Sequence, residues 1–282
     1  MDKLCDLHTH SIYSDGTFSP AQLIAEAERN GISAIALTDH NTLSGLPDFL
    51  SAAKDSSVEA IPGIEFSTDY QDAELHIVTL FVKPEHYGPI TELTDAMNQR
   101  KQQSNLNLID HLNRAGYQIS YEKIKSSMPN REPNRALIAA ELVRLGYCAT
   151  VKEAFKTLLG TKCGYYQPPK HIDAFELIKF VRSMGLVPIF AHPFLSLKDE
   201  EQIEKFLEVA TECGLQGMET RYPVFSAEQT STLEKLAARF GLAQSGGSDF
   251  HGANKPDLSL GTGYGDLQVP YHFLNSLRDR LR

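Results

Sequence analysis

The sequence predicts an α/β fold interrupted by a helical insertion. Strand-like and helix-like segments alternate over the first third of the 282 residues and again from about residue 173. The strand-like runs are continuously apolar, which is typical of a parallel sheet covered by helices. Between these regions, periodic apolar residues predict helices from about residue 89 to about residue 160. A chain of this length can form one α/β barrel, or a smaller core with an inserted domain.

The first third is expected to contain strands alternating with two helices. Ser19 followed by Pro20 is a typical helix start, and Gly31 is a typical helix end. We therefore expect helices at residues 20–30 and 46–54, and strands at residues 3–8, 34–38, 58–64 and 74–82.

The middle of the chain is expected to be a helical domain, residues 89–165, inserted between two barrel segments, residues 1–88 and 166–282. Such an insertion is either a lid over a site or a peripheral helical bundle with no role at the site. In the last third we expect strands at 186–191, 215–219 and 242–245, and helices at 175–184, 200–213, 227–240 and 271–281.

Composition limits the classes of function. A net charge of −9 argues against broad nucleic-acid binding, which needs a basic surface, and no DNA-binding surface is evident. It does not exclude an anionic substrate, because two or three divalent ions would make a pocket locally positive. The sequence has no apolar run near the ~20 residues of a membrane span and no signal peptide, so we expect a cytoplasmic protein. The four scattered cysteines are expected to be structural thiols, and no pattern indicates an oligomeric state.

Five of the ten histidines fall in four short clusters at the ends of expected strands, and a sixth, His76, lies in another expected strand. Residues i and i+2 of a strand point to the same side, so His8 and His10 can hold one ion, as can Asp249 and His251. Imidazole and carboxylate together suit zinc, manganese or iron, and more ligands are present than one ion needs. The candidate ligands are His8-Thr9-His10, Thr38-Asp39-His40, His192-Pro193 and Asp249-Phe250-His251, with Glu65 and His76 at two further strand positions.

Other conspicuous residues are interpreted as structural. A histidine without ligand-type neighbours is usually a hydrogen-bonded core or surface residue. Residues 261–265, with three glycines, lack the strand–helix setting of a nucleotide-binding loop and are expected to form a turn. The four histidines interpreted in this way are His86, His111, His171 and His272.

The order of these motifs resembles the polymerase-and-histidinol-phosphatase (PHP) superfamily of metal-dependent phosphoesterases. The resemblance covers the chain outside the insertion and implies a distorted (β/α)7 barrel with a trinuclear metal centre. It is strongest to the branch with a helical insertion after the strand that carries His76, whose members act on nucleoside 3′,5′-bisphosphates or on short RNA from the 5′ end. The motifs that carry it are His8-x-His10, Ser14-Asp15-Gly16, Thr38-Asp39-His40, Pro62-Gly63-Ile64-Glu65, His76, His192-Pro193 and Asp249-x-His251.

The resemblance implies nine ligands for two to three divalent ions. Glu65 would bridge the first two ions, since a carboxylate has two oxygens and can join ions ~3.5–4 Å apart. Glu65, Asp15 and His192 are the expected catalytic residues, and Asp39 is expected to orient a ligand histidine rather than to bind metal. The implied ligands are His8, His10, Glu65 and Asp249 for the first ion, Glu65, His76 and His192 for the second, and Asp15, His40 and His251 for the third.

The implied activity is hydrolysis of a phosphomonoester of a small nucleotide or metabolite. A hydroxide bridging the first two ions would attack phosphorus in line, because cations both neutralise the phosphate dianion and acidify a bound water. The expected partner is a small phosphorylated substrate, best matched by a nucleoside 3′,5′-bisphosphate or a 5′-phosphorylated short RNA.

Candidate substrate contacts are less well marked. Arg135 matches an arginine of the branch and could bind a phosphate with two hydrogen bonds, or it could be a surface charge at a helix start. Leu137 and Ala140 replace a histidine and a second arginine of the branch, which weakens the prediction of bisphosphate specificity. The other candidate phosphate contacts are Arg131, Lys170 and Arg221.

Three alternative functions remain at this point. The chain could be a phosphatase of histidinol phosphate or another metabolite. It could be an amidohydrolase-type metal hydrolase, although that class usually has a carbamylated lysine where Glu65 is the expected bridge. It could also be a non-catalytic, metal-stabilised module, against which the complete ligand set argues.

Overall fold

The computed structural model of the chain describes residues 3–127 and 133–281. The chain divides into two units. The first comprises Met1–Thr91 and His171–Arg282, and the second comprises Glu92–Lys170. These limits lie within a few residues of the expected insertion at 89–165.

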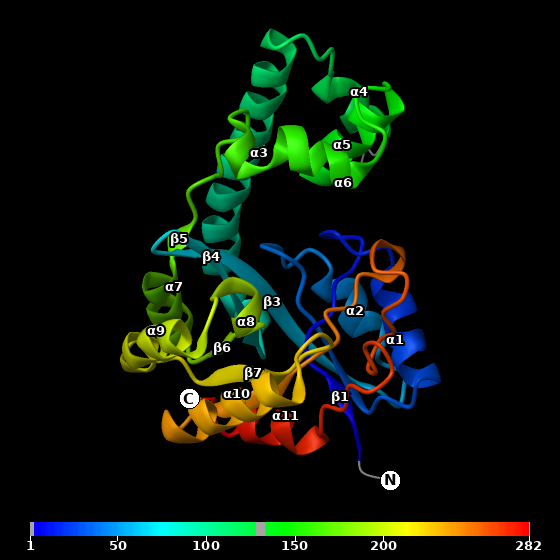
Figure 1. Ribbon diagram of the computed structural model, residues 1–282. Helices are drawn as coiled ribbons and strands as arrows, with labels where there is room; N and C mark the ends of the chain where they lie inside the picture. The colour runs from blue at the N-terminus through cyan, green and yellow to red at the C-terminus, as the bar shows by residue number, and fades with distance from the viewer. Residues whose placement is uncertain (1–2, 128–132, 282) are drawn as a thin grey trace. The chain divides into compact units, whose positions relative to one another are not determined.

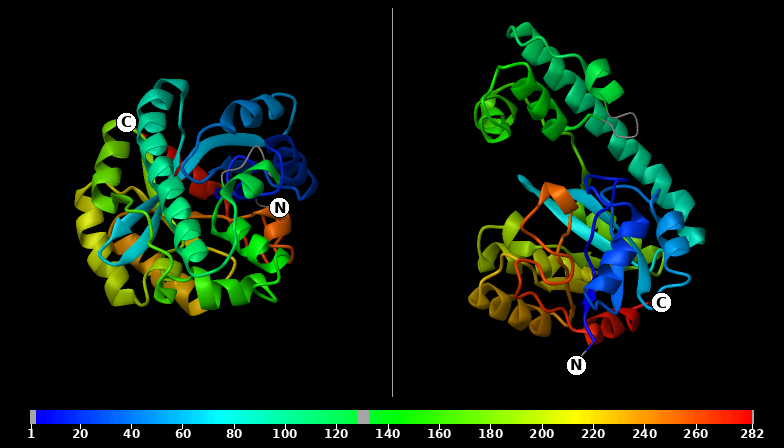
Figure 2. Two further views of the ribbon diagram at one scale, coloured as in Figure 1. Left: turned by 90° about the horizontal axis from the view of Figure 1, so that it is seen from above. Right: turned by 90° about the vertical axis from the view of Figure 1, so that its right-hand side faces the viewer.

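The first unit is built on one sheet with helices outside it (Figures 1 and 2). The strands follow the order β1-β2-β3-β4-β6-β7-β8, and β5 pairs with β3. The strands are β1 (Cys5–Asp6), β2 (Ala34–Leu37), β3 (Glu59–Tyr70), β4 (Ala73–Leu80), β5 (Ile172–Asp173), β6 (Val187–Phe190), β7 (Gly217–Arg221) and β8 (Ala243–Gly246). The helices are α1 (Pro20–Arg29), α2 (Leu46–Ala52), α7 (Ala174–Ser183), α8 (Pro193–Ser196), α9 (Glu200–Glu212), α10 (Ala227–Arg239) and α11 (Tyr271–Arg278), with the 3-10 turns η1 (Pro84–His86) and η4 (Gly252–Asn254).

The first and last strands approach each other and nearly close the sheet into a barrel. The Leu7 amide donates to the Gly246 carbonyl at 3.1 Å, and the Asp249 amide donates to the His8 carbonyl at 2.9 Å. The α/β barrel with a helical insertion, predicted from the sequence, is therefore confirmed. The closure also brings the two ends of the sequence together at the predicted ligands.

The sheet is parallel, as expected from the sequence, except at β4. Only Gln71 and Asp72 separate β3 from β4, and Gln71 adopts a left-handed conformation with φ of 53°. Parallel neighbours need a crossover of a dozen or more residues, so two residues can form only a hairpin. β4 therefore runs antiparallel to β3, with Ser67 opposite His76, and it is antiparallel to β6 as well.

Several element boundaries also differ from expectation. The predicted strand at 3–8 is reduced to Cys5–Asp6, because the next residues bond to the loop after β8 instead of continuing a ladder. β5 and α8 were not expected, since two and four residues are too few to show a periodicity. The expected helix start is confirmed, with a capping box between Ser19 and Gln22.

The barrel interior is a core of small and branched apolar side chains. Residues from β1, β2, β3, β4, β6 and β8 contribute to it, and the last helix, α11, packs its apolar face into the same core. Burying these side chains is the main driving force that holds the strands in place. Its members include Cys5, Leu7, Ala36, Ile61, Val78, Val187, Ile189, Phe273, Leu274 and Leu277.

The second unit has its own core and, in the residues described, only helical elements. This core is formed by side chains from Leu108 to Tyr166. No helix among the residues described in either unit is long and apolar enough to cross a membrane. The elements of the second unit are α3 (Tyr87–Arg114), which begins in the first unit, α4 (Tyr121–Ser127), α5 (Arg135–Arg144), α6 (Val151–Ala154), the π-helix η2 (Phe155–Leu159) and the 3-10 turn η3 (Thr161–Cys163).

Candidate metal centre

Nine histidine, aspartate and glutamate side chains lie together at one end of the barrel sheet. Segments after the carboxyl ends of β1, β2, β6 and β8 supply seven of them, and β3 and β4 supply the other two. All nine ligands implied by the resemblance are in this cluster, which we call the metal centre. Within each of four overlapping groups the ligand atoms lie within 4.8 Å of one another: His10, Asp15, His40 and His251; His8, His10 and Asp249; His8, Glu65 and His192; and His40, Glu65 and His76.

The Glu65 carboxylate lies at the middle of the metal centre. Its Oε1 is 2.9 Å from His76 Nδ1 and 3.0 Å from His192 Nε2. Its Oε2 is 3.1 Å from His8 Nε2 and 3.2 Å from His10 Nε2. The two oxygens thus face the two imidazole pairs implied for the first and second ions, which is the arrangement a bridging carboxylate needs.

Two buried polar atoms without hydrogen-bond partners among the described residues also indicate that the site suits metal ions. Glu65 Oε2 and His40 Nδ1 are buried and 3.1 Å apart, and neither makes a hydrogen bond of acceptable geometry within the described part of the chain. Buried polar atoms are almost always satisfied, and an unsatisfied carboxylate oxygen is costly. A divalent cation would satisfy both atoms at once.

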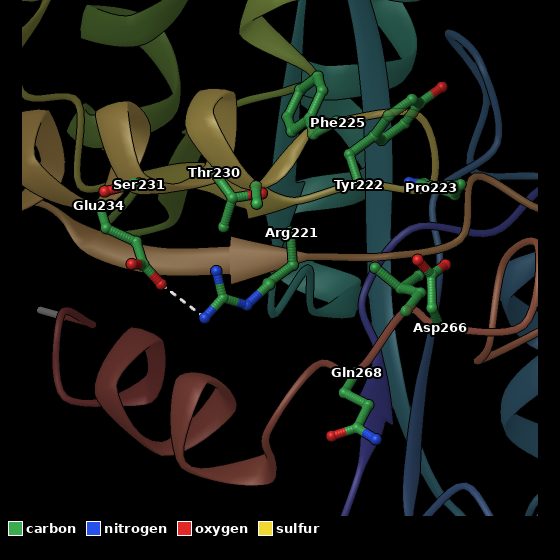
Figure 3. A pocket seen from close by; sticks show the side chains of 11 residues that line it. Arg221, Tyr222, Pro223, Phe225, Thr230, Ser231, Glu234, Asp266 and Gln268 are labelled. Carbon is green, nitrogen blue, oxygen red and sulfur yellow. Dashed lines mark ion pairs between the residues drawn. The ribbon is translucent and has the colours of Figure 1, made fainter.

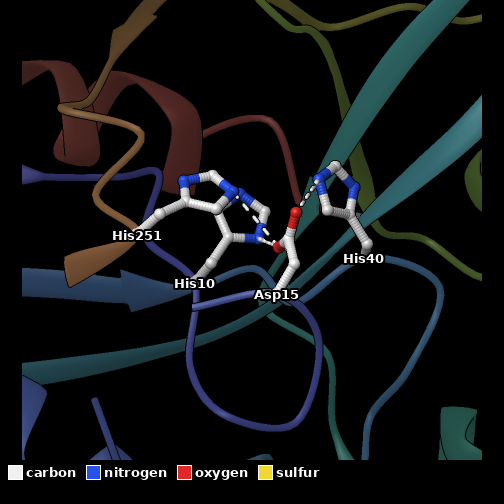
Figure 4. Close-up of side chains that lie close together, drawn as sticks. All are labelled: His10, Asp15, His40 and His251. Atoms are coloured by element: carbon white, nitrogen blue, oxygen red, sulfur yellow. Dashed lines mark ion pairs between the residues drawn. The ribbon is translucent and has the colours of Figure 1, made fainter. Parts of the chain in front are cut away.

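A third group joins Asp15 to three histidines (Figure 4). The Asp15 carboxylate is 3.1 Å from His251 Nε2, 3.8 Å from His10 Nδ1 and 3.9 Å from His40 Nε2. The Asp15 side chain is 40% exposed and that of His40 is 19% exposed, whereas His10 is fully buried. The metal centre is therefore open to solvent on the Asp15 side.

The antiparallel course of β4 explains why His76 belongs to this cluster. His76 lies in the first half of β4, opposite Ser67, and its carbonyl accepts from the Ala191 amide at 3.0 Å. Had β4 run parallel to β3, this half of the strand would lie at the other end of the barrel. The hairpin thus brings His76 level with Glu65 and with His192.

Two of the ligands have strained backbones. His192 has φ of 30° and Asp249 has φ of 52°, a region that residues other than glycine seldom occupy. Such conformations persist only where surrounding interactions impose them. For His192 one such interaction is the hydrogen bond that its amide donates to Glu219 Oε2 at 2.7 Å.

Glu219, in the middle of β7, was not predicted from the sequence. It is fully buried, and its Oε1 is 2.8 Å from His8 Nδ1. A carboxylate on Nδ1 directs Nε2 of the same ring toward a metal ion and makes the imidazole a stronger ligand. The signal that could have revealed it is an acidic residue inside a strand expected from the sequence, which the structure shows to be largely buried.

Asp39 has a different partner from the expected one. Its carboxylate accepts from the Ser11 amide at 2.7 Å, the Ser11 hydroxyl at 2.6 Å and the Ser14 hydroxyl at 2.6 Å. It therefore holds the loop that carries Asp15, and Glu219 takes the role of orienting a histidine. As expected, Asp39 is not among the possible ligands.

The remaining oxygen of Asp249 is held by two side chains that were not predicted. Tyr222 Oη donates to Oδ2 at 2.7 Å, and Lys255 Nζ lies 2.6 Å from the same oxygen. Oδ1 faces the centre, 3.1 Å from His10 Nε2. Burial, followed by the charge of Asp249, raises the pKa of Tyr222, so its hydroxyl keeps its proton.

Arg221 lines a separate pocket of about 400 Å³ (Figure 3). Its guanidinium forms an ion pair with Glu234 at 2.5 Å, while Tyr222 points to the other side of the chain. The structure thus gives Arg221 a protein partner. A contact with substrate remains a prediction.

The other candidate substrate contacts belong to the second unit. Arg135 begins α5, capped by Asn134, and its guanidinium lies 4.2 Å from the centre of the Tyr166 ring. Lys170 is exposed at the end of this unit. Arg131 lies outside the described residues.

The residues interpreted as structural are also accounted for. The expected turn is present, with Ser259 bridged to Gly263. The four cysteines are free. Among the residues described, none of the four isolated histidines belongs to a possible metal group: His86, His111, His171 and His272.

Replacing Glu65 with Gln is expected to remove most bound metal, because one change weakens two ions. The loss of metal affinity should exceed the roughly ten- to a hundredfold loss that is typical when a residue hydrogen-bonded to a metal ligand is replaced. Elemental analysis after metal supplementation should give two or three ions per chain for the parent and for Glu85→Gln, an exposed control. A parent protein that binds less than one metal ion per chain, or a Glu65→Gln variant with the same metal content as the parent, would contradict the assignment.

Metal binding is expected to release protons and to strengthen as pH rises. Burial opposes a charged imidazole, but Glu65 outweighs it and raises the pKa of His76 to about 10, and Asp249 and Glu65 together raise that of His10 to about 9. At neutral pH these rings hold protons that a metal ion must displace. Calorimetry in buffers of different ionisation enthalpy measures the release, and an affinity unchanged between pH 6 and pH 9 would refute this expectation.

Comparisons with known proteins agree with this geometry. A family model described as PHP domain matches residues 6–216. The chain is 31% identical over 251 residues to a 5′-3′ exoribonuclease from Haemophilus influenzae, covering 89% of this chain and 91% of that protein. It is 25% identical over 257 residues to a 3′,5′-nucleoside bisphosphate phosphatase from Chromobacterium violaceum, covering 91% and 90%.

A solved structure has the same fold. It comes from Bifidobacterium adolescentis and is assigned to the metal-dependent phosphoesterases. It matches with a TM-score of 0.84 at 24% identity, covering 99% of this chain and 97% of that one. The family match spans more than half of the chain, including most of the metal centre. The chain therefore belongs to the PHP domain family.

Proposed function

We propose that this chain is a metal-dependent phosphoesterase that hydrolyses a phosphomonoester of a nucleotide at the metal centre. The observation that carries the proposal is the Glu65 carboxylate, whose Oε1 faces two imidazoles and whose Oε2 faces three, all at 2.9–3.2 Å. Both relatives are named as enzymes that hydrolyse phosphate esters, and the similarity covers nearly the whole length of each.

The nine residues would hold two or three divalent ions in the groups implied by the resemblance. Mixed imidazole and carboxylate donors suit manganese, zinc or iron. When bound, such ions neutralise the charge of a phosphate group and lower the pKa of water. The number and identity of the ions are part of the proposal.

The protein itself supplies positioning and access. Glu219 fixes the His8 ring, and Asp39 fixes the loop of Asp15. A phosphate would enter on the Asp15 side, since the Asp15 side chain is 40% exposed whereas His8 and His10 are fully buried. Holding reacting groups in place before the substrate arrives is a major contribution to catalysis.

The substrate is proposed to be a nucleoside 3′,5′-bisphosphate or a 5′-phosphorylated short RNA, and the site of action the cytoplasm. The names of the two relatives support these two substrates. Leu137 and Ala140, where the branch has a histidine and an arginine, favour a weaker bisphosphate preference than in that branch. Arg135 would contribute the remaining phosphate contact in the insertion.

Two alternatives are less well supported. An amidohydrolase usually bridges its ions with a carbamylated lysine, whereas here Glu65 lies at the bridging position, with Oε1 near His76 and Oε2 near His8. A phosphatase of histidinol phosphate or another metabolite would use the same centre, so only the substrate separates it from the proposal.

A phosphate-release screen tests the function. We expect purified protein, supplied in turn with manganese, zinc and iron, to release phosphate from nucleoside bisphosphates or 5′-phosphorylated dinucleotides faster than from histidinol phosphate or sugar phosphates. Amide, lactone and deaminase substrates serve as the contrasting panel. Turnover confined to that second panel would refute the proposal.

Arg135→Ala tests the role of the insertion. We expect KM for a nucleoside bisphosphate to rise roughly ten- to a hundredfold, the effect of one lost charge-assisted hydrogen bond. A small monophosphate should be affected little, and metal content should be unchanged because Arg135 is no ligand. Identical kinetics for the variant and the parent on every ester cleaved would show that the insertion is structural.

A further inference from the structure

Lys255 places an ammonium group directly beside the metal centre. Its Nζ is 2.6 Å from Oδ2 of Asp249, whose Oδ1 is 3.1 Å from His10 Nε2. One carboxylate therefore separates the ammonium from the ligand atoms. The Lys255 side chain is 34% exposed, whereas that of Asp249 is 9% exposed, so the ammonium lies at the edge of the centre that solvent can reach.

The position of Lys255 is fixed by its neighbours. The Lys255 amide donates to the Gly252 carbonyl at 3.0 Å, which ends η4. The Ala253 amide donates to Thr17 Oγ1 at 2.8 Å, and Asn254 Nδ2 donates to the Asp15 carbonyl at 2.6 Å. The segment that carries the ammonium is thus bound to the loop that carries Asp15, the exposed ligand.

The ammonium has a donor to spare. A lysine has three N–H donors, and two of these are directed to Asp249, to Oδ2 at 2.6 Å and to the backbone carbonyl at 3.2 Å. No acceptor for the third is found in the residues the structure describes. Tyr222 donates to the same Oδ2, so this oxygen does not depend on Lys255 alone.

We propose that Lys255 is a substrate-binding residue, which donates its third N–H to an oxygen of the phosphate group held at the metal centre. The proposal rests on the proposed function and specifies it. A dianionic monoester gains more from a fixed cation than a monoanionic diester does, so Lys255 would favour terminal phosphates over internal ones. Arg221, by contrast, is paired with Glu234 in its own pocket.

The test compares Lys255→Met, Lys255→Arg, Tyr222→Phe and the control Lys54→Met. Lys54 is exposed after α2, which leads to the start of β3 at the opposite end of the barrel. Inorganic phosphate is the probe, titrated into metal-supplemented protein by calorimetry, with metal content measured in parallel. Kinetics on a monoester and a diester of the same nucleoside complete the comparison.

We expect Lys255→Met to weaken phosphate binding roughly ten- to a hundredfold at unchanged metal content, with partial recovery in Lys255→Arg and little change in Tyr222→Phe. The monoester should lose more kcat/KM than the diester. Loss of metal in Lys255→Met, or equal effects in Lys255→Met and Tyr222→Phe, would make Lys255 only a brace of Asp249 and overturn the proposal. Parent-like phosphate binding would overturn it too. If phosphate binding depends on Lys255 while no ester is cleaved, the proposal stands and the proposed function fails.

Discussion

A buried carboxylate surrounded by imidazoles is the interaction on which the metal centre depends. Burial disfavours the charged form of Glu65, yet His8, His40 and His76 outweigh this cost and hold the pKa of Glu65 well below its usual range. An ion of this kind is tolerated inside a protein only when its partners are held in place. The barrel supplies that constraint, because each imidazole comes from a different strand.

The topology of the sheet serves the same end. The residues after β1 and β8 bond to each other and bring His10 beside Asp249. The hairpin of β3 and β4 returns the chain so that His76 reaches Glu65 within one antiparallel pair of strands. A site assembled from both ends and the middle of the sequence requires the barrel to be folded first, because no local segment contains more than two or three ligands.

The clustering of the nine candidate ligands could be predicted because they occur in short motifs whose residue types have few other uses. Glu219, Tyr222 and Lys255 stand alone in the sequence, so nothing local distinguishes them from ordinary charged or aromatic residues. The direction of β4 was missed because apolar runs do not encode direction, and only the short connection at Gln71 excluded a crossover. The hydrogen-bond partners of Asp39 could not be predicted either, because they depend on where the fold places Ser11 and Ser14 of the neighbouring loop.

Buried acidic side chains around the metal centre hold the segments that carry the candidate ligands in place. Asp6 accepts from the Ser248 amide and hydroxyl at 2.9 and 2.5 Å, just before the strained Asp249. Asp39 and Glu219 hold the Asp15 loop and the His192 backbone in the same way. Each of these carboxylates lies within or shortly after a barrel strand, and each accepts a hydrogen bond from a segment that carries a candidate ligand. The strained backbone of His192 is thus held by its own hydrogen bond to Glu219, and that of Asp249 follows a serine that is bound to Asp6. These acids lie outside the possible metal groups found among the described residues and help to set the positions of the candidate ligands.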